Sequence, residues 1–226
     1  MSESQSSRMA TWAYIAPFIA FVGIMAIEKA LSIPPQIAYP IRFCTVWALV
    51  LALSRPYLNF RFSAPLASIA IGAAVFVIWV GPDLLSPHYR QSWLFNNSVV
   101  GTAVSSISPE LRQATWFILI RMLSCTLLVP IVEELFWRGW LMRWMIDRDF
   151  WNVPLGKYDA TAFWVTAVLF ASEHGPYWEV GLITGVIYNW WMVRTKNLAD
   201  CILMHAVTNG ILSVYVVLSG RWEYLF

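Results

Sequence analysis

The stretch that decides the fold is Leu128-Val129-Pro130-Ile131-Val132-Glu133-Glu134-Leu135-Phe136-Trp137-Arg138-Gly139-Trp140. It places two adjacent carboxylates and an arginine in a segment that is otherwise apolar enough for lipid. An ionisable side chain inside a membrane span costs a few kcal/mol or more, so it faces a partner or a cavity. The stretch therefore predicts a membrane-spanning helix with a polar interior face.

The two neighbouring carboxylates differ in their surroundings. Glu134 and Arg138 lie one helical turn apart, which predicts an ion pair that supports the fold and shapes the charge of the site. Glu133 is rotated by about 100° around the helix and cannot share that contact equally. A buried carboxylate without a local partner is suited to act as a general base, and we predict this role for Glu133.

The composition indicates a polytopic membrane protein. Of 226 residues, 59% are hydrophobic and 12% are charged, and the mean hydropathy is +0.60. A span needs about 20 residues. We expect an all-α bundle of about seven to eight transmembrane helices with a polar cavity at the midplane, forming one domain over residues 1–226. The net charge of +2 is too small to suggest nucleic acid as a partner.

The apolar runs give the expected order of the spans, which is 9–27, 37–53, 65–80, 114–137, 162–174, 180–193 and 198–218. The fifth and sixth runs are short, and Gly175-Pro176 between them predicts a tight turn at depth or shortened helices around a cavity. The polar connection 84–112 is expected to include a surface helix. More Lys and Arg residues fall in loops on the side of the N-terminus than in loops on the other side, and this excess favours a cytoplasmic N-terminus. Arg42 is counted among the loop residues of the other side.

Two further polar clusters interrupt apolar runs, namely Phe170-Ala171-Ser172-Glu173-His174 and His205-Ala206-Val207-Thr208-Asn209. His205 and Asn209 are four residues apart and project from one helix face. At about 1.5 Å per residue, Glu133, His174 and His205 all lie near the middle of a ~30 Å hydrocarbon core. We expect the carboxylate, the two imidazoles and the Asn209 carboxamide to meet in one buried pocket.

This set of side chains suits hydrolysis by water. Glu133 would deprotonate a water held jointly with His174, and His205 and Asn209 would donate hydrogen bonds to the developing oxyanion. Zn²⁺ held by Glu133, His174 and His205 is an alternative that would also permit hydrolysis. Other readings are a transporter or channel, or a catalytically silent immunity or scaffold protein. Arg121 receives no role, and Glu173 and Glu179 are expected at the rim.

The three polar blocks resemble the CPBP family of intramembrane proteases, which includes the CAAX prenyl endopeptidases. The resemblance rests on Glu133-Glu134-x-x-x-Arg138, Phe170-x-x-x-His174 and His205-x-x-x-Asn209, in this order. It extends from Pro109 to the C-terminus, with a motif-bearing core at about 109–218. Between the blocks, Leu141-Met142-Arg143-Trp144, Asp149-Phe150 and Val153-Pro154 resemble the bacterial CAAX-protease-related proteins that accompany exosortase and PEP-CTERM sorting systems.

The resemblance implies a glutamate-type, metal-independent endopeptidase with no cofactor. It implies that the residue matching Glu133 activates water with His174, and that His205 and Asn209 form the oxyanion site. The partners it implies are membrane lipid, a membrane-embedded or C-terminally anchored protein substrate, and exosortase-system proteins. It places the chain in the bacterial inner membrane as a multi-pass protein, with the substrate and its cleavage site left open.

Overall fold

The computed structural model describes residues 3–105 and 107–224, with side chains from residue 10 onward. The helices are α1 (Glu3–Ala30), α2 (Pro35–Leu49), α3 (Pro65–Leu85), α4 (Thr115–Leu123), α5 (Val129–Glu134), α6 (Met142–Trp144), α7 (Ala160–Ser172), α8 (Trp178–Thr195) and α9 (Leu198–Ser219). Because α4, α5 and α6 are joined by π-helical turns, they form one continuous segment, Thr115–Trp144. The described residues form no β-strand, so the predicted all-α class is confirmed.

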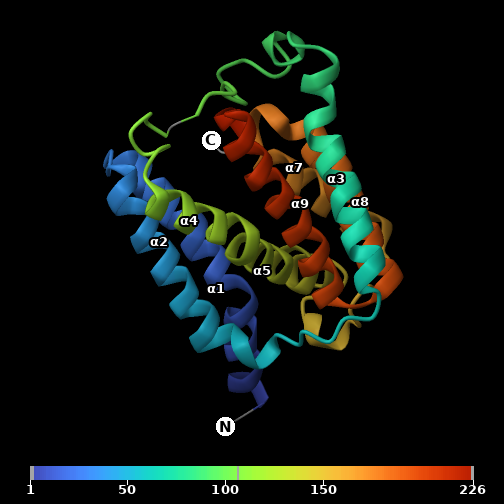
Figure 1. Cartoon of the computed structure of the whole chain (residues 1–226). Helices are drawn as coiled ribbons and strands as arrows, with labels where there is room; N and C mark the ends of the chain where they lie inside the picture. Colours follow the sequence, from blue (N-terminus) through green and yellow to red (C-terminus); the bar gives the residue numbers. More distant parts are fainter. Residues whose placement is uncertain (1–2, 106, 225–226) are drawn as a thin grey trace.

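The bundle has two sides that are joined by a tilted helix (Figure 1). On one side α1 packs against α2, and on the other α3 packs against α9 and α7 against α8. The segment containing α4 and α5 runs obliquely between the two sides and contacts α9. Helix α1 begins at one end of the bundle, and α9 finishes toward the other end (Figure 1).

Five helices are long and apolar enough to cross a membrane, namely Ala10–Ala30, Pro35–Tyr57, Pro65–Leu85, Thr115–Trp144 and Leu198–Ser219. The shorter apolar helix α7 has 13 residues. It is joined to α8 by a single 3₁₀ turn, Gly175–Tyr177, so the fifth run forms a shortened helix that ends in a tight turn, whereas the sixth run lies in α8, which has 18 residues. The chain is a multi-pass membrane protein.

Two glycines let helices approach each other closely. A Cβ atom on Gly72 of α3 would lie 2.4 Å from the carbonyl oxygen of Met204 on α9. A Cβ atom on Gly185 of α8 would lie 3.1 Å from the carbonyl oxygen of Ala167 on α7. Small residues at these crossings permit close van der Waals packing, which is the main source of helix association within lipid.

The start of α3 is fixed by the first turn of α9. The Asp200 carboxylate is buried and accepts hydrogen bonds from the backbone N–H groups of Ser63 and Ala64 at 3.1–3.2 Å. These are the unpaired donors that precede a helix. One turn earlier, the Asn197 side chain caps α9 by accepting from the N–H of Ala199 at 2.9 Å. One short segment therefore sets the positions of both α3 and α9.

The connection between α3 and α4 is less helical than expected. In place of a surface helix, the described residues 86–105 and 107–114 contain one 3₁₀ turn, Tyr89–Gln91, and irregular turns, and α3 itself continues to Leu85. The frequent Ser, Asn and Pro residues favour local turns over a helix. Near the end of α3, Asp83 accepts a hydrogen bond from the Tyr224 hydroxyl at 2.8 Å. Burial together with that hydrogen bond raises the pKa of Tyr224, so the hydroxyl keeps its proton at neutral pH.

Arg90 ties this connection to the turn between α7 and α8. Its Nε donates to Asp83 at 3.1 Å, and its Nη1 donates to the carbonyl oxygen of Pro176 at 2.6 Å and to Glu179 at 2.8 Å. Glu179, which the sequence placed at a rim, therefore anchors the loop. The contacts hold the loop against the turn that follows His174.

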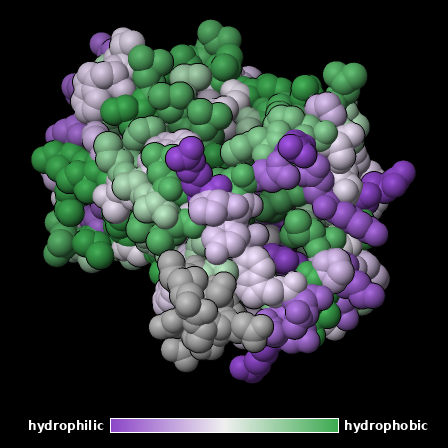
Figure 2. Space-filling view, turned by 90° about the horizontal axis from the view of Figure 1, so that it is seen from below, coloured by the Kyte–Doolittle hydropathy of each residue, from purple (hydrophilic) through white to green (hydrophobic). Residues whose placement is uncertain are grey.

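Figure 2 views the molecule from the end at which α1 begins. Polar residues gather toward the middle and along one side of this end, whereas hydrophobic residues occupy much of the periphery. This distribution fits a bundle whose flanks face lipid and whose end faces water.

Candidate active site

The helix that carries the two glutamates is irregular at two places. The π-helical segments Ser124–Leu128 and Leu135–Leu141 lie on either side of α5. Pro130 has no N–H to donate to the carbonyl one turn earlier, and the first π-helical segment occurs at that turn. Single π turns in α-helices occur frequently at functional sites. The sequence reading assumed a regular helix here and missed both segments.

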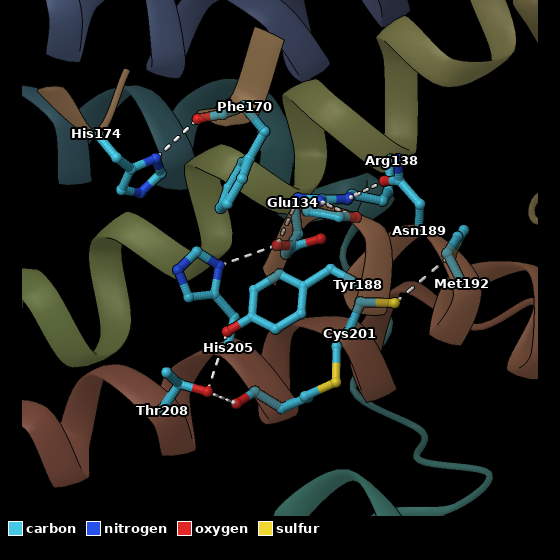
Figure 3. Close-up of polar contacts among 12 residues, drawn as sticks. Glu134, Arg138, Phe170, His174, Tyr188, Asn189, Met192, Cys201, His205 and Thr208 are labelled. Atoms are coloured by element: carbon cyan, nitrogen blue, oxygen red, sulfur yellow. Dashed lines mark hydrogen bonds and ion pairs between the residues drawn. The ribbon is translucent and has the colours of Figure 1, made fainter. Parts of the chain in front are cut away.

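Glu134 is the centre of a buried charge cluster (Figure 3). Its side chain and that of Arg138 have no exposed surface, and Arg138 Nη1 donates to Glu134 Oε1 at 3.1 Å. The predicted ion pair is therefore present. The same oxygen lies 2.9 Å from Nδ1 of His205, a contact that the sequence did not predict. His205 thus faces Glu134 with one ring nitrogen and has the other, Nε2, for a different partner.

Arg138 is held by groups from two further helices (Figure 3). Its Nε donates to Oδ1 of Asn189 on α8 at 2.9 Å, and the Asn189 amide donates to the carbonyl oxygen of Phe163 on α7 at 2.7 Å. The guanidinium carbon also lies 4.7 Å from the centre of the Phe170 ring. Asn189 was not singled out from the sequence, although an amide in the middle of an apolar helix is a signal that could have identified it.

Glu133 has different surroundings from its neighbour. Its Oε2 atom is buried and has no hydrogen-bond partner among the described residues, and the side chain lines a cavity. Glu133 is close enough to Glu134 and Glu173 for their charges to interact with it. Glu134 is therefore paired with Arg138 and His205, whereas Glu133 faces the cavity.

A partly open cavity of about 210 Å³ lies beside α5. It is lined by residues of α1, α2, α3, α4, α5, α7, α8 and α9. The cavity brings together Glu133, His174, His205 and Asn209, the four residues that the sequence analysis selected for catalysis. Glu173 also lines it and is exposed, in keeping with a position at the rim.

The orientation of His174 fixes which of its ring nitrogens carries a proton. Nδ1 lies 2.7 Å from the carbonyl oxygen of Phe170. Because a carbonyl oxygen only accepts, Nδ1 carries the hydrogen, and Nε2 of the neutral ring is an acceptor. Gly181 of α8 makes room for the ring, since a Cβ atom there would lie 3.2 Å from it.

Asn209 is positioned by the backbone of the opposite helix. Its Nδ2 donates to the carbonyl oxygen of Cys125 at 3.0 Å, which uses one of the two amide hydrogens. At the preceding position of α9, Thr208 accepts from the Tyr188 hydroxyl at 3.0 Å and donates to the carbonyl oxygen of Gly72 at 2.9 Å. The Tyr188 ring packs against His205, so this chain of contacts supports the imidazole from behind. The sequence analysis missed Tyr188 and Thr208.

Two arginines line the cavity at positions that the sequence reading misjudged. Arg42 was counted among loop cations, but it lies within α2, is buried and pairs with Glu28. Arg121 was given no role, yet it is buried on α4 and lines the cavity. Both side chains point toward the interior, because placing a charge beside a partner or a polar cavity costs less free energy than placing it in lipid.

The arrangement does not group metal ligands. Among the described residues, no set of three or more His, Cys, Asp and Glu side chains is arranged to hold a metal ion. Glu133, His174 and His205 share the cavity, but as placed they do not form the donor set of the Zn²⁺ alternative, whose ligands would all lie about 2 Å from one ion.

The fold and the cavity define a class of protein, a multi-pass helical membrane protein with a polar cavity lined by acids and histidines. Residues 114–211 match the family model described as Rce1-like, type II CAAX prenyl endopeptidase Rce1-like. This segment is therefore similar to the Rce1-like CAAX endopeptidases of the CPBP family, and it includes all the motif residues from Glu133 to Asn209. The match indicates a peptidase of the CAAX type. No curated protein and no solved structure matches the chain.

Proposed function

We propose that the chain is an intramembrane endopeptidase that hydrolyses a peptide bond with water activated by Glu133. The observation that carries this proposal is the contrast between the two glutamates. Glu134 is matched by Arg138 and His205, whereas Glu133 presents a buried, unpaired oxygen to the cavity that also contains His174.

Glu133 and His174 would hold the attacking water between them. Glu133 accepts one proton from the water, and Nε2 of His174 accepts a hydrogen bond from its other hydrogen, since Nδ1–H is already used by Phe170. The resulting hydroxide attacks the carbonyl carbon of the scissile bond. Glu133 then delivers the proton to the leaving amine, which balances the reaction.

The developing oxyanion would be bound from α9. Asn209 offers its second amide hydrogen, because the first is used by Cys125. His205 can donate from Nε2 only if both ring nitrogens carry hydrogens, since Nδ1–H faces Glu134. The Glu134 carboxylate offsets the charge of that doubly protonated ring, much as a buried aspartate stabilises an imidazolium in a catalytic triad. Glu134 is then a positioning and charge-balancing residue.

The name of the matched family points to prenylated proteins that end in a CAAX sequence. For this chain we propose a membrane-embedded or C-terminally anchored protein as substrate, in the bacterial inner membrane. Maturation of exported proteins beside an exosortase system belongs to the same proposal. It is supported by the resemblance of the segment between Leu141 and Pro154.

The test compares Glu133→Gln with wild type on a quenched fluorescent, prenylated CAAX-type peptide, using protein purified in detergent. Glu133→Gln keeps the shape of the side chain and loses proton acceptance, so we expect turnover to fall roughly 100- to 10,000-fold. His174→Ala should give a similar loss. Asn209→Ala should cost about 100- to 1000-fold, the effect of one oxyanion donor.

Glu110→Gln is the matched control, because this exposed residue lies outside the helical spans and carries the same change. Thermal midpoints are measured for every variant. Activity should persist in EDTA and phenanthroline. Wild-type turnover in Glu133→Gln with an unchanged midpoint would rule out Glu133 as the base, and loss of activity in chelators that is restored by Zn²⁺ would replace the glutamate mechanism with a metal-dependent one.

A further inference from the structure

We infer that a second pocket, at the end of the bundle where α3 and α9 finish, binds the phosphate of an anionic membrane phospholipid through Arg112. This pocket shares no lining residue with the catalytic cavity. None of the residues that carry the inference takes part in the hydrolysis described above, so the inference is independent of the proposed function.

The depth of the pocket follows from α3 and α9. The two helices are parallel neighbours, because Asp200 in the first turn of α9 binds the backbone of Ser63 and Ala64 just before α3. They have 21 and 22 residues, and both are apolar enough to span a membrane. Helices of this length cross a hydrocarbon core of ~30 Å. Their last residues, Leu85 and Ser219, therefore lie at the level of the lipid headgroups.

The pocket lies between these helix ends and the connection after α3, which arches over this end of the bundle (Figure 1). Its volume is about 560 Å³, within the ~300–1,000 Å³ of small-molecule sites. The charged residues that line it are three arginines and two acids, namely Arg90, Arg112, Arg221, Asp83 and Glu223. Arg90 pairs with Asp83. Arg221 pairs with Glu223. One positive charge is left over, so the pocket suits an anion.

Arg112 carries the unmatched charge. It is half-buried and forms no ion pair with any described residue. Its Nε donates to the carbonyl oxygen of Ile107 at 2.9 Å, and its guanidinium carbon lies 5.7 Å from the centre of the Trp222 ring. These two contacts orient the guanidinium group. They leave its Nη1 and Nη2 atoms, which bond to no other described residue, available to a ligand.

The donors at this site match a phosphate group. Arginine presents a planar fork of N–H groups that binds phosphate oxygens in pairs. Arg90 lines the same pocket, and its Nη2 atom is buried without a hydrogen-bond partner among the described residues. A phosphate between Arg112 and Arg90 would give that atom an acceptor. The Trp222 ring is of the kind that is enriched at the headgroup level of membranes.

Exposed leucines beside the pocket indicate that the ligand is a lipid and not a free anion. Leu85 lies two residues after Asp83 and is 87% exposed, and Leu218 lies two residues before Gly220 and is 81% exposed. Asp83 and Gly220 both line the pocket. A polar pocket with apolar side chains on the membrane side fits a molecule with a phosphate headgroup and acyl chains.

The unmatched charge of Arg112 also selects among lipids. Phosphatidylglycerol has a net negative charge, which Arg112 would neutralise. Phosphatidylcholine has the same phosphate, but its choline cation would be placed near the arginines and repelled by them. We therefore expect phosphatidylglycerol to bind about tenfold or more tightly than phosphatidylcholine.

The experiment uses the purified full chain in detergent and two lipids with identical acyl chains, dioleoylphosphatidylglycerol and dioleoylphosphatidylcholine. Native mass spectrometry measures bound lipid, and tryptophan fluorescence follows thermal unfolding. At 100 times its Kd, phosphatidylglycerol should raise the thermal midpoint by about 5–10 °C. Inorganic phosphate at the same concentration should leave the midpoint unchanged, because it has no acyl chains to contact Leu85 and Leu218. These comparisons use wild-type protein, so they do not depend on whether a variant folds.

Arg112→Gln should weaken binding of phosphatidylglycerol roughly 10- to 100-fold, the effect of losing one or two charge-assisted hydrogen bonds. Arg112→Lys keeps the charge without the fork and should keep part of the lipid preference. Arg55→Gln is the matched control, because it removes the same charge from an exposed position before α3, at the opposite end of the bundle. It should bind both lipids as wild type does.

Three results would overturn the inference. The first is equal binding of the two lipids to wild type. The second is an undiminished preference for phosphatidylglycerol in folded Arg112→Gln protein, which would place the lipid elsewhere. The third is a rise in midpoint with inorganic phosphate as large as with phosphatidylglycerol, which would mean that the pocket takes a free anion and no lipid.

Discussion

Replacing Arg138 with methionine should strongly destabilise the protein, and the structure gives the reason. Methionine keeps most of the length and apolar contacts of the side chain but removes the charge and its donors. Three contacts are lost, to Glu134 at 3.1 Å, to Asn189 at 2.9 Å and to the carbonyl oxygen of Gly185 at 3.4 Å. Glu134 then keeps a fully buried carboxylate with His205 as its remaining partner.

The expected magnitude follows from the burial of both partners. Both side chains are 0% exposed. Removing one partner of such a pair costs about 3–5 kcal/mol, because the other charge remains without compensation. For a chain of this size, each 1 kcal/mol lowers the thermal midpoint by about 2–4 °C, which gives a shift of roughly 6–20 °C.

The assay is thermal unfolding in detergent, followed by intrinsic tryptophan fluorescence, with the monodisperse fraction from size-exclusion chromatography as a second measure. Arg194→Met is the matched control, because Arg194 is exposed near the end of α8. Glu134→Gln and the double variant Glu134→Gln/Arg138→Met complete a double-mutant cycle. We expect the double variant to be less destabilised than the sum of the single variants, because it leaves no unpaired charge.

Two results would refute this reasoning. One is a thermal midpoint for Arg138→Met within the error of Arg194→Met. The other is strict additivity in the cycle, which would mean that Glu134 and Arg138 do not stabilise one another in spite of their contact.

Two further predictions concern single positions in neighbouring helices. Gly181→Ala places a methyl group 3.2 Å from the His174 ring, so the ring must move, and we expect kcat for the fluorogenic peptide to fall by about tenfold or more while the thermal midpoint changes little. An unchanged kcat would show that the position of His174 does not matter to turnover. Asp200→Ala leaves the N–H groups of Ser63 and Ala64 without an acceptor and should cost about 1–3 kcal/mol, measured by thermal unfolding, whereas Asp200→Asn keeps one oxygen and should cost less. Equal losses in the two Asp200 variants would contradict a capping role.

Much of the site was accessible from the sequence because membrane burial makes polar residues conspicuous. A charged side chain in an apolar span is expected to have a partner. The spacing of Glu134 and Arg138 predicted an ion pair between them, and the structure contains this pair. The same logic failed for Arg42. Its position in a run of apolar residues was visible, but its side chain was counted as a loop cation, and only the packing of α1 against α2 shows that it points inward to Glu28.

The sequence by itself determined the all-helical class, the order of the apolar segments and the motif positions, because helical periodicity and hydropathy are local properties of the chain. The tertiary structure decided which side chains from distant parts of the chain contact one another. Contacts of Glu134 with His205, of Arg138 with Asn189 and of Asn209 with Cys125 join distant parts of the chain. They depend on how α4, α5, α8 and α9 cross and on the two π-helical segments, which shift the facing of every residue beyond them. Pro130 marks the first of these segments, but no local pattern encodes the second one or the crossing angles, so the difference between the paired Glu134 and the open Glu133 emerges only when the bundle is packed.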